Sequence, residues 1–485
     1  MMRLISFFTA VLLPVVLFAL DFPVHKKVLD NGLTVLLYPN TQAPTVSCRL
    51  FYVTGSVNEI PGSSGLAHIL EHELFKGTKK VGVTDFHKDS ILLVKQDSVM
   101  SLSREAAVRG DSLNAQKFRA EYDSLVEEER QYMVKEELWS AYQQAGGTGL
   151  NAFTTDLMTA YFVTLPKNRL ELFLYLESDR MQNAILREFY SERDVVREER
   201  RMRYDDRPSG RYFETLNGMT YEAFPYRIPT IGWPSDIMNL TREQAAEHYR
   251  KYYKPRNAIL VLAGDLDTAS AMALVQKYFA EIPSGEAFAP ITVRDPEPAG
   301  EKRLTVYRPD APNRMDFIFK TPGVGDSSLY ALDIAEGVLN GRSGRLYKKL
   351  VEEKKVAVSA RAANSVNKIV SEFSISVLLQ PDANPDSVEA FVWEELEKLK
   401  TETVSERELA KVKNRATMGL VESFLDMENV ATQLAWYEMF GDYKILLNWP
   451  DNLGKVTPEN VQNIAQKTFS HKNATIGLLL KGEER

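Results

Sequence analysis

Residues 65–78 read GLAHILEHELFKGT and place two histidines and a glutamate, His68, Glu71 and His72, within five positions. Apolar residues recur at helical spacing along this stretch, which predicts a half-buried helix. Residues four apart on a helix differ by about 40° of rotation, so both imidazoles project in the same direction from adjacent turns. Two such imidazoles can bind one Zn²⁺ ion.

Glu71 precedes the second histidine by one residue, which is close enough to reach water at the metal but is a poor position for a third ligand. A carboxylate there can take a proton from water that zinc has made acidic and pass it to a leaving amine. These are the parts that peptide-bond hydrolysis needs. Two histidines on a helix are otherwise most often a polar surface feature, so the motif alone is suggestive.

A zinc hydrolase needs a third protein ligand, and no third histidine stands in a convincing context. The run SERDVVREERR, residues 191–201, offers carboxylates instead. Glu192 and Glu199 are seven residues apart and so fall on one helix face within about 20°, whereas Glu198 points away from it. One of the aligned pair can bind the metal while the other orients the site by hydrogen bonds. Such a charged run is more often only a salt-bridged surface.

Composition indicates a globular protein with at least two domains, because the chain has 485 residues, 44% of them apolar and 26% charged. The formal charge of −7 gives no basic field for nucleic acid, which excludes it as an expected partner. Cys48 is the only cysteine, so no disulfide can form within the chain.

The first twenty residues, MMRLISFFTAVLLPVVLFAL, combine one early positive charge with an apolar run. The run is short for a spanning helix, which favours a signal peptide at 1–20 over a retained anchor, although cleavage is weakly specified. No other segment is apolar enough to span a bilayer. We therefore expect an exported protein, periplasmic or secreted.

The order of elements is repeated along the chain. Strands and helices over residues 21–282 are followed by a segment rich in Pro, Gly and Glu at 283–300, and then by a similar series over 301–485. NAILVLAGDLD, starting at residue 257, is echoed by NATIGLLLKGE, starting at 473. The sequence predicts an α+β fold with two similar domains, each an antiparallel or mixed sheet with helices packed on one face. The densely charged stretch at about 84–142 predicts solvated helices.

HILEH is the inverted zinc motif H-x-x-E-H. With GSSGLAHILEHELFKGT, NAFTT, SERDVVREERRMRYDDRP, FPYRIPTIGWPSDI and YYKPRNAILVLAGDLD, in this order, the chain resembles the family of pitrilysin, insulin-degrading enzyme and mitochondrial processing peptidase. The resemblance implies a zinc metalloendopeptidase with half of a clamshell-shaped fold and one zinc per chain. It implies the site residues by position: His68, His72 and Glu199 as ligands, Glu71 as general base, Glu192 as a supporting residue, and Asn151, Ala152 and Phe153 on an edge strand that binds substrate.

The chain departs from the family pattern at three places. The 127 residues from His72 to Glu199 exceed the usual gap, which makes 84–142 an insertion, and Glu73 stands where an apolar residue is common. In the second half, Val351 and Val358 occupy the positions of an Arg and a Tyr that help hold the substrate carbonyl. The nearby Arg345 and Tyr347 match another part of the pattern and are expected to be structural.

Half-length members of the family pair with a second subunit. The expected partners are therefore peptide substrates and a homologous subunit that supplies the Arg and Tyr, or a second copy of the chain. A non-catalytic scaffold or assembly subunit of the same fold is the rival hypothesis. A structural metal module, which would show four closed ligands, is another.

Overall fold

The computed structural model describes residues 22–288 and 290–482. The expected signal peptide, residues 1–20, lies outside these described residues. Among the helices within them, none is both long enough and apolar enough to cross a membrane.

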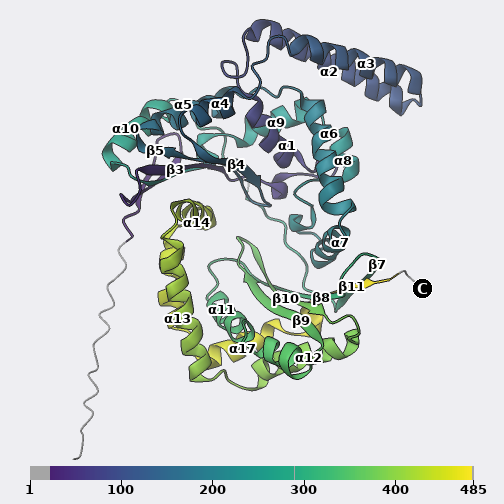
Figure 1. Cartoon of the computed structure of the whole chain (residues 1–485), viewed down its shortest axis with the longest axis vertical. Helices are drawn as coiled ribbons and strands as arrows, with labels where there is room; N and C mark the ends of the chain where they lie inside the picture. The colour runs from purple at the N-terminus through teal and green to yellow at the C-terminus, as the bar shows by residue number, and fades with distance from the viewer. Residues whose placement is uncertain (1–21, 289, 483–485) are drawn as a thin grey trace, which may run out of the picture.

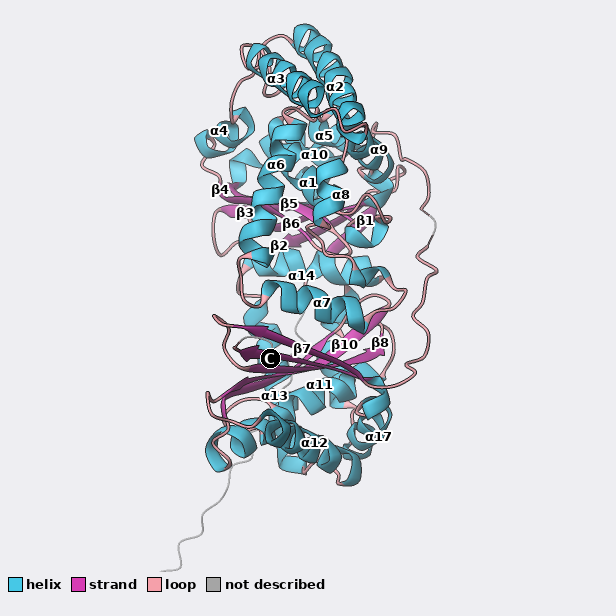
Figure 2. Ribbon diagram, turned by 90° about the vertical axis from the view of Figure 1, so that its right-hand side faces the viewer, coloured by secondary structure: helices cyan, strands magenta, loops and turns pink. Residues whose placement is uncertain are grey.

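Two β-sheets lie one above the other, each in its own half of the chain (Figures 1 and 2). The first sheet has six strands in the order β1-β2-β6-β3-β5-β4. Its strands are β1 (His25–Val28), β2 (Thr34–Pro39), β3 (Thr45–Tyr52), β4 (Thr148–Thr154), β5 (Thr159–Pro166) and β6 (Ala258–Gly264). Only β2 and β6 pair in parallel. Because β4 is the last strand in this order, one of its sides has no neighbouring strand and forms an open edge of the sheet.

The second sheet repeats this arrangement with five strands in the order β7-β11-β8-β10-β9. They are β7 (Lys302–Arg308), β8 (Arg314–Pro322), β9 (Ala357–Ser365), β10 (Val370–Leu379) and β11 (Ala474–Lys481). In the first sheet β6 pairs in parallel with β2 and antiparallel with β3, and in the second sheet β11 likewise pairs in parallel with β7 and antiparallel with β8. The echoed segments NAILVLAGDLD and NATIGLLLKGE thus supply equivalent strands.

The helices stand in groups between these strands. Those of the first half are α1 (Leu66–Glu73), α2 (Phe86–Val108), α3 (Ser112–Glu129), α4 (Glu137–Gln144), α5 (Leu170–Asn183), α6 (Phe189–Arg200), α7 (Gly210–Thr220), α8 (Pro234–Asn239), α9 (Arg242–Tyr252) and α10 (Thr268–Phe279). Those of the second half are α11 (Ser328–Leu339), α12 (Pro385–Thr401), α13 (Glu406–Ser423), α14 (Met427–Phe440), α15 (Lys444–Leu447), α16 (Trp449–Gly454) and α17 (Pro458–Thr468).

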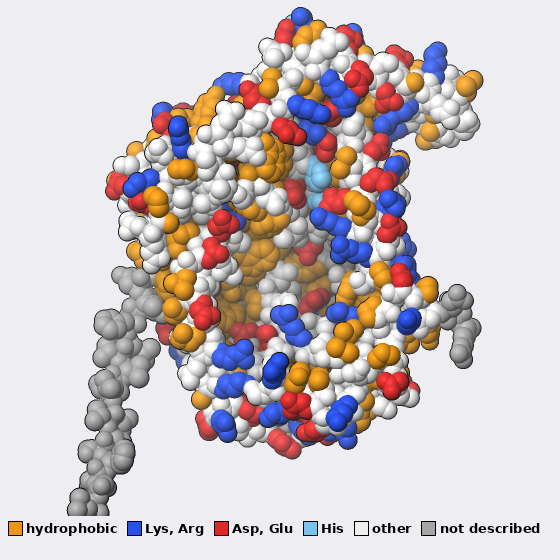
Figure 3. All heavy atoms as spheres, viewed as in Figure 1, with side chains coloured by type: hydrophobic (Ala, Val, Ile, Leu, Met, Phe, Trp, Pro, Cys, Tyr) orange, Lys and Arg blue, Asp and Glu red, His pale blue; other side chains and the backbone are white. Residues whose placement is uncertain are grey.

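One face of each sheet packs against helices of its own half, and the other face receives a helix from the opposite half. Helix α14 covers the first sheet, where Val430 and Leu434 share a buried cluster with Val261 of β6. Helix α7 covers the second sheet, and there the Tyr212 hydroxyl donates to Asp316 Oδ2 at 2.9 Å. The predicted α+β class is confirmed, and these two exchanged helices add a second covered face to each sheet. Figure 3 shows a deep hollow between the halves with histidine exposed on its wall.

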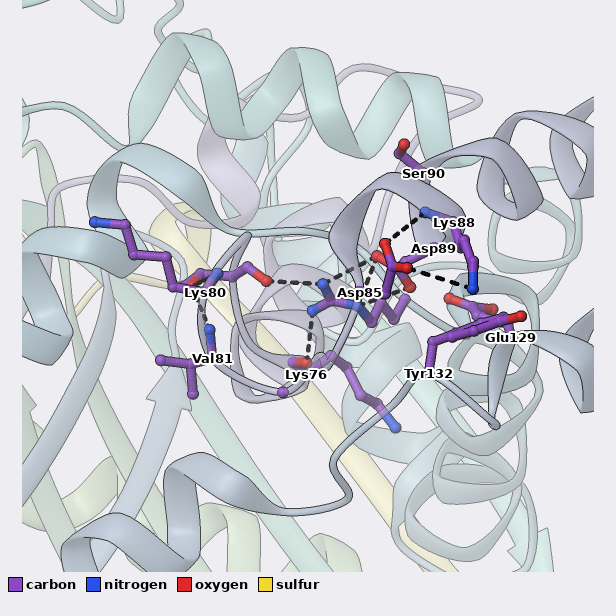
Figure 4. A network of polar contacts seen from close by, with 12 residues as sticks. Lys76, Lys80, Val81, Asp85, Lys88, Asp89, Ser90, Glu129 and Tyr132 are labelled. Carbon is purple, nitrogen blue, oxygen red and sulfur yellow. Dashed lines mark hydrogen bonds and ion pairs between the residues drawn. The ribbon is translucent and has the colours of Figure 1, made fainter.

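Helices α2 and α3 form a hairpin that projects from the first half (Figure 1). A fully buried ion pair fixes its base, since Arg187 Nη2 lies 3.0 Å from Asp89 Oδ2. The same guanidinium donates to the carbonyl oxygens of Lys76 and Thr78 at 3.2 and 2.7 Å, in the network around Asp89 drawn in Figure 4. The hairpin base is thereby joined to the chain that leaves α1. The domain limits 21–282, 283–300 and 301–485 stay predictions.

Candidate metal centre

Two residues, Gly65 and Glu59, fix the N-terminus of helix α1. Gly65 has φ of 93°, a left-handed value, and a Cβ there would lie 2.8 Å from the Ile231 carbonyl oxygen. The buried Glu59 carboxylate accepts the backbone N–H groups of Gly65 and Ala67 at 2.8 and 2.7 Å. Because the first N–H groups of a helix have no partner within it, Glu59 satisfies donors that would otherwise be buried and unpaired.

The structure brings His68 and His72 of α1 together with Glu199 of α6. Glu199 Oε2 lies 3.7 Å from His68 Nε2 and 3.4 Å from His72 Nε2. One donor atom from each residue lies within 4.8 Å of the others. Two imidazole nitrogens and one carboxylate oxygen are the donor set of a catalytic zinc site, in which a fourth position stays open. The residues present therefore fit zinc.

The two histidines differ in their electrostatic environment. His68 is only 7% exposed, and burial lowers its pKa to about 4, with the charge of His72 as a second cause. Its imidazole is therefore neutral and free to bind a metal. Burial also lowers the pKa of His72, but hydrogen bonds to Glu192 and Glu199 outweigh this effect and raise the pKa to about 9. Both carboxylates therefore favour a positively charged His72 ring, Glu192 from the side of Nδ1 and Glu199 from the side of Nε2.

Glu71 is held beside this cluster by a residue of the edge strand. The Thr154 hydroxyl donates to Glu71 Oε2 at 2.6 Å. Burial raises the pKa of the Glu71 carboxyl, whereas the Thr154 hydrogen bond lowers it. Glu71 is thus a half-buried carboxylate with one fixed oxygen and one free oxygen, as a general base needs.

The aligned carboxylates of α6 occupy different positions around His72. Glu192 Oε2 lies 3.5 Å from His72 Nδ1, and Glu192 Oε1 lies 2.5 Å from Lys76 Nζ. Burial raises the pKa of Glu192, but His72 and Lys76 together lower it to about 2, so the carboxyl is ionised. Glu199 Oε1 accepts from Arg203 Nη1 at 2.7 Å, which leaves Oε2 for the histidines.

The predicted substrate-binding residues Asn151, Ala152 and Phe153 lie on β4, the open edge of the first sheet. They line a cavity of about 650 Å³ together with His68, Glu71, His72 and Glu199. All the described residues that line this cavity belong to the first half of the chain. An edge strand beside the cluster leaves backbone groups free to pair with an added strand.

The second half contributes none of the residues lining this cavity. Val358 is 50% exposed on β9, the strand equivalent to β4, and Val351 packs against the core of the second half. The Arg345 guanidinium binds the Glu408 carboxylate through contacts of 2.9 and 3.0 Å. This pairing agrees with the structural role expected for Arg345.

Three residues that the sequence did not single out support the site: Thr154 on Glu71, Lys76 on Glu192 and Arg203 on Glu199. Arg203 stands four residues after Glu199, so helical spacing carried a signal for that pair. Thr154 is 83 residues from Glu71, and no local pattern predicts that contact. Glu73 is fully buried beside His72, and neither carboxylate oxygen has a hydrogen-bond partner among the described residues. Its burial raises the pKa well above the usual value.

Comparison with known proteins agrees with this geometry. Residues 34–90 match the family described as Insulinase (Peptidase family M16), and residues 239–416 match the one described as Peptidase M16 inactive domain. The chain is 26% identical to the zinc protease PqqE of Helicobacter pylori over 463 residues, which cover 93% of this chain and 92% of that protein. The chain is thus similar to M16 peptidases in both of its halves.

Two solved structures share the fold. A protease from Helicobacter pylori superposes with a TM-score of 0.78 at 24% identity, covering 95% of this chain and 100% of that one. Pitrilysin superposes with a TM-score of 0.71 at 17% identity, covering 96% of this chain but 45% of pitrilysin. This chain therefore corresponds in fold to about half of pitrilysin, in line with the half-length resemblance.

Proposed function

We propose that this protein is a zinc-dependent endopeptidase subunit that cleaves unfolded peptides or short protein segments. The observation that carries the proposal is the convergence of His68, His72 and Glu199, one donor atom of each lying within 4.8 Å of the others, with Glu71 fixed beside them. His68, His72 and Glu199 would hold one zinc ion per chain. Zinc, when bound, supplies the Lewis acidity that makes water acidic near neutral pH.

The chain's own residues handle the proton and the orientation. Glu71 takes the proton from the attacking water through its free oxygen and passes it to the leaving amine, while Thr154 holds the other oxygen. Glu192 orients the His72 ring through Nδ1 and is itself held by Lys76. The ligand set leaves room for water, which a closed four-ligand structural site would not.

The substrate would bind as an added strand along β4. Asn151, Ala152 and Phe153 lie on this open edge and line the cavity that contains Glu71. A peptide paired with β4 would place its backbone next to the water-activating carboxylate. A folded segment has no free backbone for this pairing, which is why unfolded substrates fit.

We further propose that a second subunit of similar fold, or a second copy of the chain, completes the site. Val351 and Val358 provide no hydrogen-bond donors where family members place an Arg and a Tyr, and the described lining of the cavity comes from one half alone. A partner would add donors for the developing oxyanion. The apolar run at residues 1–20 supports export to the periplasm or the exterior.

The test combines zinc content with cleavage of an unfolded peptide, for the wild type and Glu71→Gln. The variant should keep zinc and lose at least about a hundredfold in activity, because a general base contributes about 10²–10⁴. Glu198→Gln is the matched control, since Glu198 is an exposed carboxylate on α6, next in sequence to the expected ligand Glu199 but outside the cavity lining. Strong activity from the isolated chain, with no partner added, would contradict the partner requirement.

The rival function is a non-catalytic scaffold of the same fold. A wild type that binds no zinc and cleaves no peptide, with or without a similar subunit, would favour the scaffold. The placement of Glu71 argues against it, since a scaffold has no use for a half-buried carboxylate held beside a three-donor cluster.

A further inference from the structure

A smaller cavity lies where the two halves of the chain meet. Its volume is about 110 Å³, and since about 10–15 Å³ suffices for one water molecule, it has room for an ion with several waters. One side comes from the first half, through Asp156 in the turn between β4 and β5 and through the segment that follows α7. The other side comes from the second half, through Glu372 of β10 and the turn that joins β9 to β10. A ligand in this cavity would therefore contact both halves.

Two carboxylates line this cavity, one from each half. Asp156 Oδ1 accepts from the Ser56 and Thr230 hydroxyls at 3.0 and 3.2 Å. Glu372 Oε1 accepts from the Tyr221 hydroxyl at 2.6 Å. The second oxygen of each carboxylate, Asp156 Oδ2 or Glu372 Oε2, receives no hydrogen bond from a described residue. Each carboxylate therefore has one oxygen left for a ligand.

The charges of the two carboxylates are not neutralised within the described part of the chain. Burial raises the pKa of both carboxyl groups, and the charge of Asp156 raises the pKa of Glu372 further. Neither carboxylate forms an ion pair with a Lys, Arg or His among the described residues. Two like charges that share a half-buried cavity repel each other and attract a cation.

A buried hydroxyl beside the carboxylates also lacks a partner. Tyr226 is 7% exposed and lines the cavity, and its hydroxyl makes no hydrogen bond with a described residue. Burial raises the pKa of Tyr226, and the charges of Asp156 and Glu372 raise it further, so the hydroxyl lies in the field of both carboxylates. Because an unpaired buried hydroxyl is unfavourable, a cation with its bound water would stabilise this arrangement.

The other polar groups of the lining are also oxygen donors for a metal. They are the side chains of Asn217 on α7 and of Ser365 and Asn367 around the turn between β9 and β10. The described lining contains no histidine or cysteine, the ligands that zinc prefers. Ca²⁺ takes six to eight oxygen ligands in flexible geometry, whereas Mg²⁺ demands a near-ideal octahedron. Oxygen donors from separate segments of the chain, with room for water, suit Ca²⁺ better.

We propose that this cavity binds one Ca²⁺ ion, which links the two halves of the chain through Asp156 and Glu372. The ion would neutralise both carboxylates and would give the Tyr226 hydroxyl a partner. Asp156 lies two residues after Thr154 of β4. Thr230, which donates to Asp156, also lines the cavity of the candidate metal centre. The link would therefore anchor the second half beside the end of β4 that holds Glu71 in place.

Direct binding tests this proposal on the full-length protein, after treatment with zinc and removal of the excess. Equilibrium dialysis in metal-stripped buffer measures binding of Ca²⁺ and, in parallel, of Mg²⁺. One Ca²⁺ site per chain should saturate below about 5 mM, because the weaker protein sites for Ca²⁺ bind at about 10⁻⁴–10⁻³ M. Absence of saturable Ca²⁺ binding, or tighter binding of Mg²⁺ than of Ca²⁺, would overturn the proposal.

Substitutions that keep the shape of the cavity locate the site. Glu372→Gln and Asp156→Asn each remove one charge and should weaken Ca²⁺ binding at least about tenfold, because affinity depends on the number of charged ligands. Tyr226→Phe removes only the hydroxyl and should weaken binding less. Glu397→Gln is the matched control, since it removes a carboxylate from the exposed side of α12 and should leave the affinity unchanged. Wild-type affinity in both carboxylate variants would refute the assignment.

Thermal unfolding separates the loss of a ligand from the loss of the fold. Saturating Ca²⁺ should raise the Tm of the wild type and of Glu397→Gln, because a ligand that binds only the folded state stabilises it. Without Ca²⁺, Glu372→Gln should unfold at or above the wild-type Tm, since it removes the repulsion from Asp156, and Ca²⁺ should barely shift its Tm. An equal shift with Ca²⁺ in Glu372→Gln and the wild type would contradict the proposal. Neither measurement depends on peptide cleavage, so a protein without peptidase activity would leave the calcium site standing.

Discussion

Replacing Thr154 with valine should separate the general base from the metal ligands. The two side chains have nearly the same shape, so Thr154→Val removes one hydroxyl and little else. In the structure this hydroxyl is 2.6 Å from Glu71 Oε2 and is the only side-chain donor that reaches the carboxylate among the described residues. Hydrogen bonds to charged groups contribute about 1.5–3 kcal/mol.

That free energy corresponds to a loss of about 10- to 150-fold in kcat/KM if it acts fully on Glu71. The carboxylate of the variant would be half-buried without its donor, so it would be harder to ionise and less well placed. Because Thr154 binds none of the three ligand residues, zinc content should stay at the wild-type level.

The assay is kcat/KM for an unfolded peptide, with zinc content and urea unfolding measured on the same samples. Thr154→Ser keeps the hydroxyl and should recover most of the lost activity. Thr164→Val is the control, since the Thr164 hydroxyl donates to Glu428 on α14, away from the site, at 2.8 Å. Wild-type kcat/KM in Thr154→Val, or a loss of zinc equal to the loss of activity, would refute the role given to Thr154.

Three further predictions concern stability. Gly65→Ala should destabilise the fold by about 2 kcal/mol or more and weaken zinc binding. An alanine is strained at φ of 93°, and its Cβ would lie 2.8 Å from the Ile231 carbonyl oxygen. Unchanged urea unfolding would contradict this prediction. Glu214→Gln should lower the free energy of unfolding by about 3–5 kcal/mol, because the Arg200 guanidinium, 2.7 Å away in a buried pair, loses its counter-charge. Replacing both residues with apolar ones should recover much of this loss, as measured by thermal unfolding. Burial lowers the pKa of His248 to about 3, so below about pH 6.5 the unfolded chain binds a proton that the folded chain does not. The free energy of unfolding should therefore fall by about 2 kcal/mol from pH 7 to 5. A His248→Asn variant whose free energy of unfolding falls equally over this pH range would exclude this cause.

Local periodicity predicted the parts of the site that lie on single helices. His68 and His72 share a face of α1 because they are four residues apart, and Glu192 and Glu199 share a face of α6 because they are seven apart. The repeated order of elements likewise predicted two similar halves, and β6 and β11 do occupy equivalent places in their sheets. These features depend on backbone geometry within one element, or on comparison of one segment with another, so they are visible in the sequence.

Contacts between distant elements were decided only by the tertiary structure. Spacing left open which carboxylate of α6 faces the histidines, and the packing of α6 against α1 places Glu199 between both Nε2 atoms and Glu192 at Nδ1. The bond from Thr154 to Glu71 and the exchange of α7 and α14 between the halves depend on how separate surfaces meet. A sequence records which face of an element is apolar, but many partners can cover such a face. Which partner does so follows from the packing of the whole chain, because burial is favourable without being directional.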